Sequence, residues 1–403
     1  MNASNQASKT ISGLSRRELL GASALGAASL MGPAGCSRDT QDRAAVEDHS
    51  TPLATDFELS ELTIEDLQKA MHSGESTSRQ ITSMYLQRIE SLDRQGPTLN
   101  SILEINPDAL EIADQLDAER RSNGPRSPLH GIPVLVKDNI ATADRMTTTA
   151  GSLALAGCIA PRDSWVASRL RESGAILLGK TNLSEWANFR SSQASSGWSA
   201  RGGQCRNPYV LDRNPCGSSS GSGAATSANL VSAALGTETD GSVVCPSSAN
   251  GLVGLKPTVG LVSRSGIIPI AHSQDTAGPM TRTVADAAAL LSVLAGVDPS
   301  DPATASNREP SDLDYTVFLD THGLAGSRIG VARQYFGFHP GVDAALEEVL
   351  TEMKRLGAEL IDPVELSTRG AFGDAEYTVL LYEFKADLKR YLAELGSSAP
   401  VRN

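Results

Sequence analysis

Apolar residues recur at helical spacing in the first part of the chain and predict its first elements. Regular structure is expected to begin near Leu59, and Thr63 is placed to cap a first helix. Residues 77–80 (Thr-Ser-Arg-Gln) have the capping-box pattern, so a second helix is expected after them. A third helix is expected over residues 107–121. These three helices precede the first predicted strand.

Short apolar runs then alternate with helical patterns along the middle of the chain. Strands are expected over residues 132–137 and 175–178, and helices over 165–172 and 223–235. Alternation of this kind favours a mixed or parallel sheet with helices on both faces. The many glycines (36) and few aromatic residues (4%) agree with the tight strand-to-helix turns of such folds. The predicted fold class is α/β, with a mixed, twisted sheet flanked by helices on both faces.

The last part of the chain has one further strong pattern. Residues 375–395 are typical of an amphipathic helix, and residues 396–403 follow it without a terminating element. We therefore interpret residues 59–403 as one domain that is truncated at its C-terminal end.

The first residues differ in composition from the rest and are interpreted as a targeting segment. Residues 15–20 (Ser-Arg-Arg-Glu-Leu-Leu) form a twin-arginine pattern, and the apolar run of residues 19–31 is too short to span a bilayer. Residues 1–36 are thus predicted to be a twin-arginine export signal, with Cys36 where a lipoprotein signal carries its lipidated cysteine. Residues 37–58 are polar and charged, which predicts a flexible linker.

The predicted export signal indicates where the protein is located, and the net charge indicates which partners are disfavoured. We expect an exported protein that is periplasmic or secreted. If it is attached to a membrane, the expected anchor is a lipid on Cys36. Export that survives replacement of Arg16 and Arg17 by lysine would contradict the twin-arginine interpretation. The net charge of −12 argues against a nucleic-acid partner, because phosphate binding needs clustered lysine and arginine.

The remaining cysteines give no sign of a metal site. Cys158, Cys205, Cys216 and Cys245 include no C-x-x-C pair and no zinc-binding pattern. We interpret them as small buried residues, and an oxidising compartment would permit one disulfide among them. Neither a metal nor a cofactor is expected.

One segment matches the phosphate-binding loop pattern G-x-x-x-x-G-K-[ST] letter for letter. It covers residues 174–181 (Gly-Ala-Ile-Leu-Leu-Gly-Lys-Thr). Such a loop must expose backbone N–H groups to phosphates just after a strand. Here the four middle residues are apolar and prone to form a strand themselves. The segment is therefore expected to be a buried strand, and nucleotide binding is disfavoured.

Two familiar serine-enzyme patterns are also disfavoured. Residues 217–221 match G-x-S-x-G around Ser219, but a loop precedes them where a nucleophile elbow needs an apolar strand. The six histidines are scattered, and the late ones, His322 and His339, lie in polar loop contexts. No lysine has a serine three positions before it, which excludes the Ser-x-x-Lys arrangement of serine β-lactamases.

Two loops rich in glycine and serine, residues 215–223 and 235–242, enclose a stretch of small residues. Small residues let two backbones approach closely, and glycine-rich turns gather free N–H groups that favour an anion. This composition suits an oxyanion hole. Composition alone leaves open a second interpretation, in which these are two flexible turns around a plain helix.

This stretch resembles the signature region of the amidase signature family. Ser218 and Ser242 are 24 positions apart, which is the family's spacing between its two serines. Further segments resemble the family in the same order along the chain, so that the resemblance runs from about residue 59 to the end. These segments are residues 131–139, 179–187, 251–260 and 275–286.

The resemblance implies the amidase signature fold and a catalytic triad of two serines and a lysine. Ser242 would be the nucleophile, Ser218 the bridge and Lys137 the base. A serine hydroxyl is a weak nucleophile at neutral pH and needs a neighbouring base. Lysine can serve only if its pKa falls far below the usual value of about 10.4. Lys137 ends an apolar strand, which fits such a desolvated lysine.

The resemblance also assigns the groups around the triad. Gly217 and Ser219 would support Ser218, whose preceding peptide bond is cis in the family. The oxyanion hole would be formed by the backbone N–H groups of Thr239, Asp240, Gly241 and Ser242.

Departures from the commonest family pattern point to one branch. Asp240 replaces the first glycine of the usual pair before the nucleophile, and Val244 replaces an arginine after it. This variant resembles the bacterial peptide amidases, which remove C-terminal amides from peptides. The amidotransferase branch that makes glutaminyl-tRNA is disfavoured by the predicted export signal. The family's C-terminal portion has no counterpart here, in line with a truncated domain.

The expected function is a serine amidohydrolase that cleaves carboxamide C–N bonds through an acyl-enzyme and releases ammonia. Its substrates would be C-terminal peptide amides or small amides. Two alternatives remain: a broad-specificity amidase or esterase on the same triad, and an inactive truncated relic that acts as a binding protein.

Overall fold

The structure is a computed structural model that describes residues 57–307 and 313–401. The predicted export signal, Cys36 and nearly all of the predicted linker lie outside the described residues. Within the described part of the chain, no helix is long and apolar enough to cross a membrane.

The N-terminal helices form where the local patterns place them. The side chains of Thr63 and Thr77 each accept a hydrogen bond from the backbone three residues later, which completes two capping boxes. These caps begin the first two helices as predicted, and the third helix is also present. The elements are α2 (Ile64–Ser73), α3 (Ser78–Arg88), its π-helical continuation (Ile89–Gln95) and α4 (Ala109–Asn123).

The prediction that three helices precede the first strand is wrong. Strand β1 (Ile102–Ile105) lies between the second and third helices and pairs antiparallel with the edge of the main sheet. It has four residues, mostly half-buried, and its register shifts between Ile102 and Glu104. A strand this short at a sheet edge carries too little alternation to be detected in the sequence.

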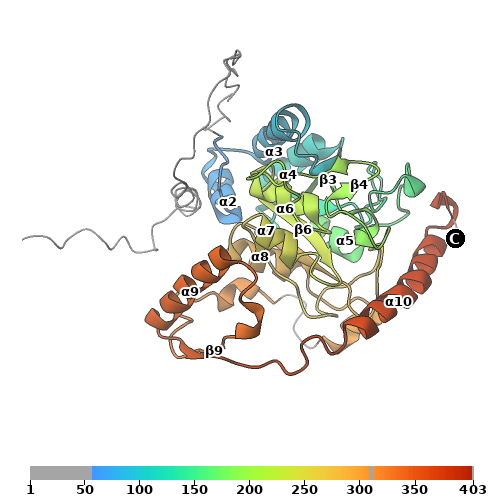
Figure 1. The fold of residues 1–403 in the computed structure, drawn as a ribbon. Helices are drawn as coiled ribbons and strands as arrows, with labels where there is room; N and C mark the ends of the chain where they lie inside the picture. The colour runs from blue at the N-terminus through green and yellow to red at the C-terminus, as the bar shows by residue number, and fades with distance from the viewer. Residues whose placement is uncertain (1–56, 308–312, 402–403) are drawn as a thin grey trace, which may run out of the picture. The chain divides into compact units, whose positions relative to one another are not determined.

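A mixed six-stranded sheet forms the centre of the fold, as predicted (Figure 1). Its order is β1-β3-β2-β6-β8-β7. β2 runs parallel to both of its neighbours, whereas β1 and β8 run antiparallel to theirs. The four central strands are buried along their whole length. The strands are β2 (Pro133–Lys137), β3 (Ile176–Thr181), β6 (Ala233–Glu238), β8 (Thr276–Thr281) and β7 (Val253–Gly254).

Helices pack against this sheet and confirm the predicted layers. α6 contacts the four central strands, α4 and α5 contact β3, and α8 contacts β8. These helices are α5 (Trp165–Glu172), α6 (Ser220–Ser227), α7 (Val244–Ala249) and α8 (Val284–Leu294). A small hairpin of β4 (Trp198–Ser199) and β5 (Gly203–Gln204) lies outside the main sheet.

The segment that imitates a phosphate-binding loop is a strand. Residues 176–181 form β3, and every one of them is buried. No phosphate can reach this backbone, because its N–H groups face neighbouring strands inside the sheet. The prediction of a buried strand is confirmed.

The prediction of a helix over residues 223–235 is wrong at both its start and its end. α6 ends at Ser227, and Asn229 adopts a left-handed backbone (φ 57°) that stops the helix. The chain then enters β6 between β2 and β8. A run of small apolar residues fits a buried strand as well as a helix, so periodicity alone cannot separate the two.

The C-terminal part adds one long helix to the domain. α10 (Gly373–Glu394), red in Figure 1, confirms the amphipathic helix expected over residues 375–395. Its Tyr391 and Leu392 pack with Leu183 and Ile268 of the main domain in one buried cluster. The other elements of this part are a two-stranded parallel sheet of β9 (Arg328–Gly330) and β10 (Glu359–Ile361), and helix α9 (Pro340–Arg355).

Candidate active site

Lys137 lies at the carboxyl end of β2 and is completely buried. Because β2 and β6 are parallel, their carboxyl ends meet at the same edge of the sheet, which brings Thr237 beside the lysine. The Lys137 Nζ donates to the Thr237 hydroxyl at 2.9 Å and to the Thr237 carbonyl at 3.2 Å. Its third partner is the Ser218 hydroxyl, at 2.8 Å. The lysine is thus held by three oxygens and aimed at Ser218.

The surroundings of Lys137 disfavour its charged form. Burial is the main cause and lowers the pKa of Lys137 to about 7, while Asp275 and Glu238 partly oppose the shift. A lysine with this pKa is partly neutral near pH 7 and can accept a proton there. The local electrostatics therefore suit a base.

Ser218 is buried at the start of the loop that leads into α6, and the Gly217–Ser218 peptide bond is cis. The Ser218 carbonyl accepts a hydrogen bond from the Ser184 backbone N–H at 3.0 Å. A methyl group at Gly217 would collide with the Ser184 hydroxyl, so this close approach requires glycine.

Ser219, the centre of the G-x-S-x-G match, has a structural position. Its hydroxyl donates to the Thr237 carbonyl at 3.1 Å and accepts from the Thr237 backbone N–H at 3.2 Å. The side chain is fully buried, so a substrate cannot reach it. These bonds fix the loop against β6 beside Lys137.

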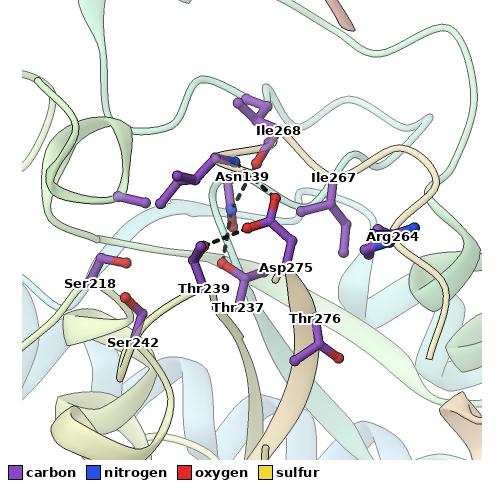
Figure 2. A pocket seen from close by; sticks show the side chains of 12 residues that line it. Asn139, Ser218, Thr237, Thr239, Ser242, Arg264, Ile267, Ile268, Asp275 and Thr276 are labelled. Atoms are coloured by element: carbon purple, nitrogen blue, oxygen red, sulfur yellow. Dashed lines mark hydrogen bonds between the residues drawn. The ribbon is translucent and has the colours of Figure 1, made fainter. Parts of the chain in front are cut away.

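Ser242 lies on the second glycine-serine loop, close to the first. Its carbonyl accepts a hydrogen bond from the Ser219 backbone N–H at 3.2 Å, which joins the two loops. Ser218 and Ser242 line one pocket, and Figure 2 shows them on neighbouring loops at one side of it. Among the described residues, no hydrogen bond joins the Ser242 hydroxyl to Ser218 or to any other group. The structure thus links Lys137 directly to Ser218 and places Ser242 beside them.

A row of unused backbone donors leads to Ser242. None of the N–H groups from Thr239 through Ser242 donates to an acceptor in the described part of the chain. The next two N–H groups, of Val243 and Val244, are bound by the Glu238 carboxylate at 2.7 and 2.9 Å. Gly241 has a left-handed backbone (φ 82°), which favours glycine and turns the chain at this point. The free donors are suited to a developing negative charge.

Two residues of the pocket have functional positions that the sequence did not reveal. Asp275 accepts a hydrogen bond from the Thr239 hydroxyl and others from the Ile270 and Ala271 backbone at 2.9 and 3.0 Å (Figure 2). Burial raises the pKa of Asp275 to about 6. Asn139 donates to the Thr237 hydroxyl at 2.9 Å. Both residues stand at the ends of family-like segments, but spacing alone gave them no role.

A disulfide between Cys216 and Cys245 joins the two serine loops. Cys216 comes two residues before Ser218, and Cys245 three residues after Ser242. Cys245 is exposed and Cys216 is half-buried, so the prediction that all four cysteines are buried is wrong for these two. Cys158 and Cys205 are buried and free. The cross-link joins positions 29 residues apart and connects the loop of Ser218 to the loop of Ser242.

Replacing Cys216 and Cys245 by serine is expected to lower the free energy of unfolding by about 2–4 kcal/mol, the usual effect of such a loop closure. Amide hydrolysis is expected to slow as well, because both serine loops lose their covalent link. Denaturant unfolding and ammonia release measure the two effects. Dithiothreitol should reproduce them in the unmodified protein and leave the double variant unchanged. If dithiothreitol changes neither the free energy of unfolding nor the rate of ammonia release, the cross-link has no part in positioning the serines.

Comparison with known proteins identifies the family. The Amidase family model matches residues 80–402. The chain belongs to the amidase family. A probable amidase of Arabidopsis thaliana is 46% identical, with 87% of this chain and 68% of the relative covered. A putative amidase of Schizosaccharomyces pombe is 43% identical, with 86% and 62% covered.

Solved amidase structures have the same fold. The native peptide amidase from Stenotrophomonas maltophilia is 55% identical, with a TM-score of 0.82 over 86% of this chain and 70% of that chain. The amidase signature fold and the resemblance to the peptide amidase branch are thereby confirmed. The chain spans about 62–70% of the length of these three relatives.

Proposed function

We propose that this amidase is a serine amidohydrolase that cleaves C-terminal peptide amides or small carboxamides and releases ammonia. The observation that carries the proposal is the buried Lys137 Nζ at 2.8 Å from the Ser218 hydroxyl, in a pocket shared with Ser242. A lysine with a pKa of about 7 can activate a serine without any histidine. The similarity to a peptide amidase supports the choice of substrate.

In the proposed first half-reaction, the Ser242 hydroxyl attacks the amide carbonyl carbon. Its proton passes to Ser218, and Ser218 gives its own proton to neutral Lys137. The carbonyl oxygen becomes an oxyanion next to the free N–H groups of residues 239–242, which stabilise it. The C–N bond then breaks, the proton returns through Ser218 to the leaving nitrogen, and ammonia departs from a Ser242 ester.

The second half-reaction uses the same groups with water. Water attacks the ester carbonyl and passes a proton through Ser218 to Lys137. The tetrahedral intermediate collapses, the ester C–O bond breaks, and the proton returns to Ser242. A carboxylic acid leaves and the free enzyme is restored, so that each cycle consumes one water and one amide.

Rapid mixing with a C-terminal peptide amide tests the proposal. A burst of ammonia equal to the enzyme concentration, before steady turnover, is expected if the ester forms faster than it is hydrolysed. The same assay with simple amides and with esters measures the breadth of the substrate range. Comparable rates on all three would identify a broad amidase or esterase. If no amide releases ammonia, the remaining interpretation is an inactive protein that acts only by binding.

A further inference from the structure

A cleft of about 700 Å³ opens beside Ser242. Its apolar lining includes Phe189, Ile270 and three residues of α10, whereas Ser191 and Ser192 supply hydroxyl groups. The three residues of α10 are Tyr377, Leu380 and Leu381. An opening of this size, next to the proposed nucleophile, can hold the acyl part of an amide substrate.

Asp240 is the single charged residue among the described residues that line this cleft. It is exposed and lies two residues before Ser242. No described residue donates a hydrogen bond to its carboxylate or forms an ion pair with it. Its charge is therefore available to a bound substrate.

The neighbours of Asp240 add negative charge and do not neutralise it. Glu376 of α10 accepts a hydrogen bond from the Gln274 side chain at 2.8 Å, and Glu238 is bound by backbone N–H groups. Partial loss of water around its carboxyl group, and then these two carboxylates, raise the pKa of Asp240 above its ordinary value, although the residue as a whole is exposed. Arg190 lies on the loop that lines the cleft, but its guanidinium packs over the Trp198 ring at 4.6 Å from the ring centroid. Lys137 is buried and readily loses its charge. The cleft thus has a negative field at the nucleophile.

We propose that Asp240 determines specificity for the charge of the acyl group, so that amides with a positively charged acyl part are favoured over anionic ones. This inference rests on the proposed amidase function. A free carboxylate at the mouth of an apolar cleft attracts an ammonium or guanidinium group and repels a carboxylate. The chemical class of preferred substrate is therefore an amide of a peptide or amino acid that carries a cationic group near the scissile bond.

The test compares three substrates of similar length: the α-amides of N-acetyl-lysine, N-acetyl-norleucine and N-acetyl-glutamate. Ammonia release at pH 8 gives kcat/KM for each. The full chain is expected to prefer the lysine amide to the glutamate amide by about tenfold or more, and added salt should reduce that ratio. Equal rates on the lysine and glutamate amides would overturn the inference, whatever any variant shows.

Variants assign the preference to its residue. Asp240→Asn is expected to reduce the lysine-to-glutamate ratio by about tenfold, whereas Asp240→Glu should retain most of it. Asp320→Asn, at an exposed position outside the cleft, is the matched control and should keep the full ratio. An unchanged ratio in Asp240→Asn would contradict the inference while the amidase function stands. If no amide yields ammonia with the unmodified chain, the proposed function itself fails.

Discussion

Replacing Ser242 by alanine is expected to lower the rate of ammonia release from an amide by about 10⁴- to 10⁶-fold. Without this hydroxyl no ester can form, and the free N–H groups of residues 239–242 can stabilise only direct attack by water. The variant should fold normally, because the Ser242 hydroxyl makes no hydrogen bond to the described part of the chain. Steady-state ammonia release and the burst amplitude measure the effect.

Two other serines make this prediction specific. Ser248→Ala, at an exposed position on α7, is the matched control and should retain full activity. Ser219→Ala removes two hydrogen bonds to Thr237 and is expected to slow the reaction without abolishing the burst. A burst that persists in Ser242→Ala but is lost in Ser219→Ala would transfer the nucleophile to the G-x-S-x-G serine.

The second large effect is expected at Lys137. Lys137→Met should reduce amide hydrolysis by about 10⁴-fold or more, because Ser218 loses the group that accepts its proton. In the unmodified protein, kcat/KM should rise with pH through about 7, because burial lowers the pKa of Lys137 to about 7. Below that pH the lysine carries a proton and cannot act as a base. A pH series of ammonia release measures the profile.

The thermal stability of Lys137→Met shows whether a loss of activity could come from unfolding. The unfolded chain binds a proton on Lys137 up to about pH 10.4, whereas the folded chain loses it near pH 7, so this lysine lowers stability most at low pH. Lys137→Met should therefore not lower the unfolding temperature.

A second buried lysine is the control for the pH profile. Lys180 donates to the Ile140 carbonyl and the Thr148 hydroxyl and not to Ser218, so Lys180→Met should leave the inflection of kcat/KM near pH 7 in place. A flat profile between pH 5.5 and 8.5 would exclude a lysine base of this kind.

Local patterns predicted the elements that local interactions stabilise. The capping boxes at Thr63 and Thr77 need only residues three positions away, and both helices begin where the pattern indicates. The buried strand β3 was recognised because its apolar residues cannot form an exposed loop. The same approach missed β1 and misjudged residues 223–235. In both places the distinction between strand, helix and loop depends on pairing with distant strands.

The sequence by itself determined the family and the class of fold, and its resemblance to the amidase signature family identified the three triad candidates, because that resemblance depends on residue types in motifs along the chain. Only the tertiary structure decided what surrounds them. The parallel pairing of β2 with β6 puts Thr237 against Lys137, and the packing of the whole sheet removes water from the lysine and lowers its pKa. The Cys216–Cys245 bond, the position of Asp275 and the cleft around Asp240 likewise depend on contacts between segments far apart in the chain. Spacing along a chain specifies which groups are available, whereas desolvation and hydrogen bonding depend on which distant groups fold around them.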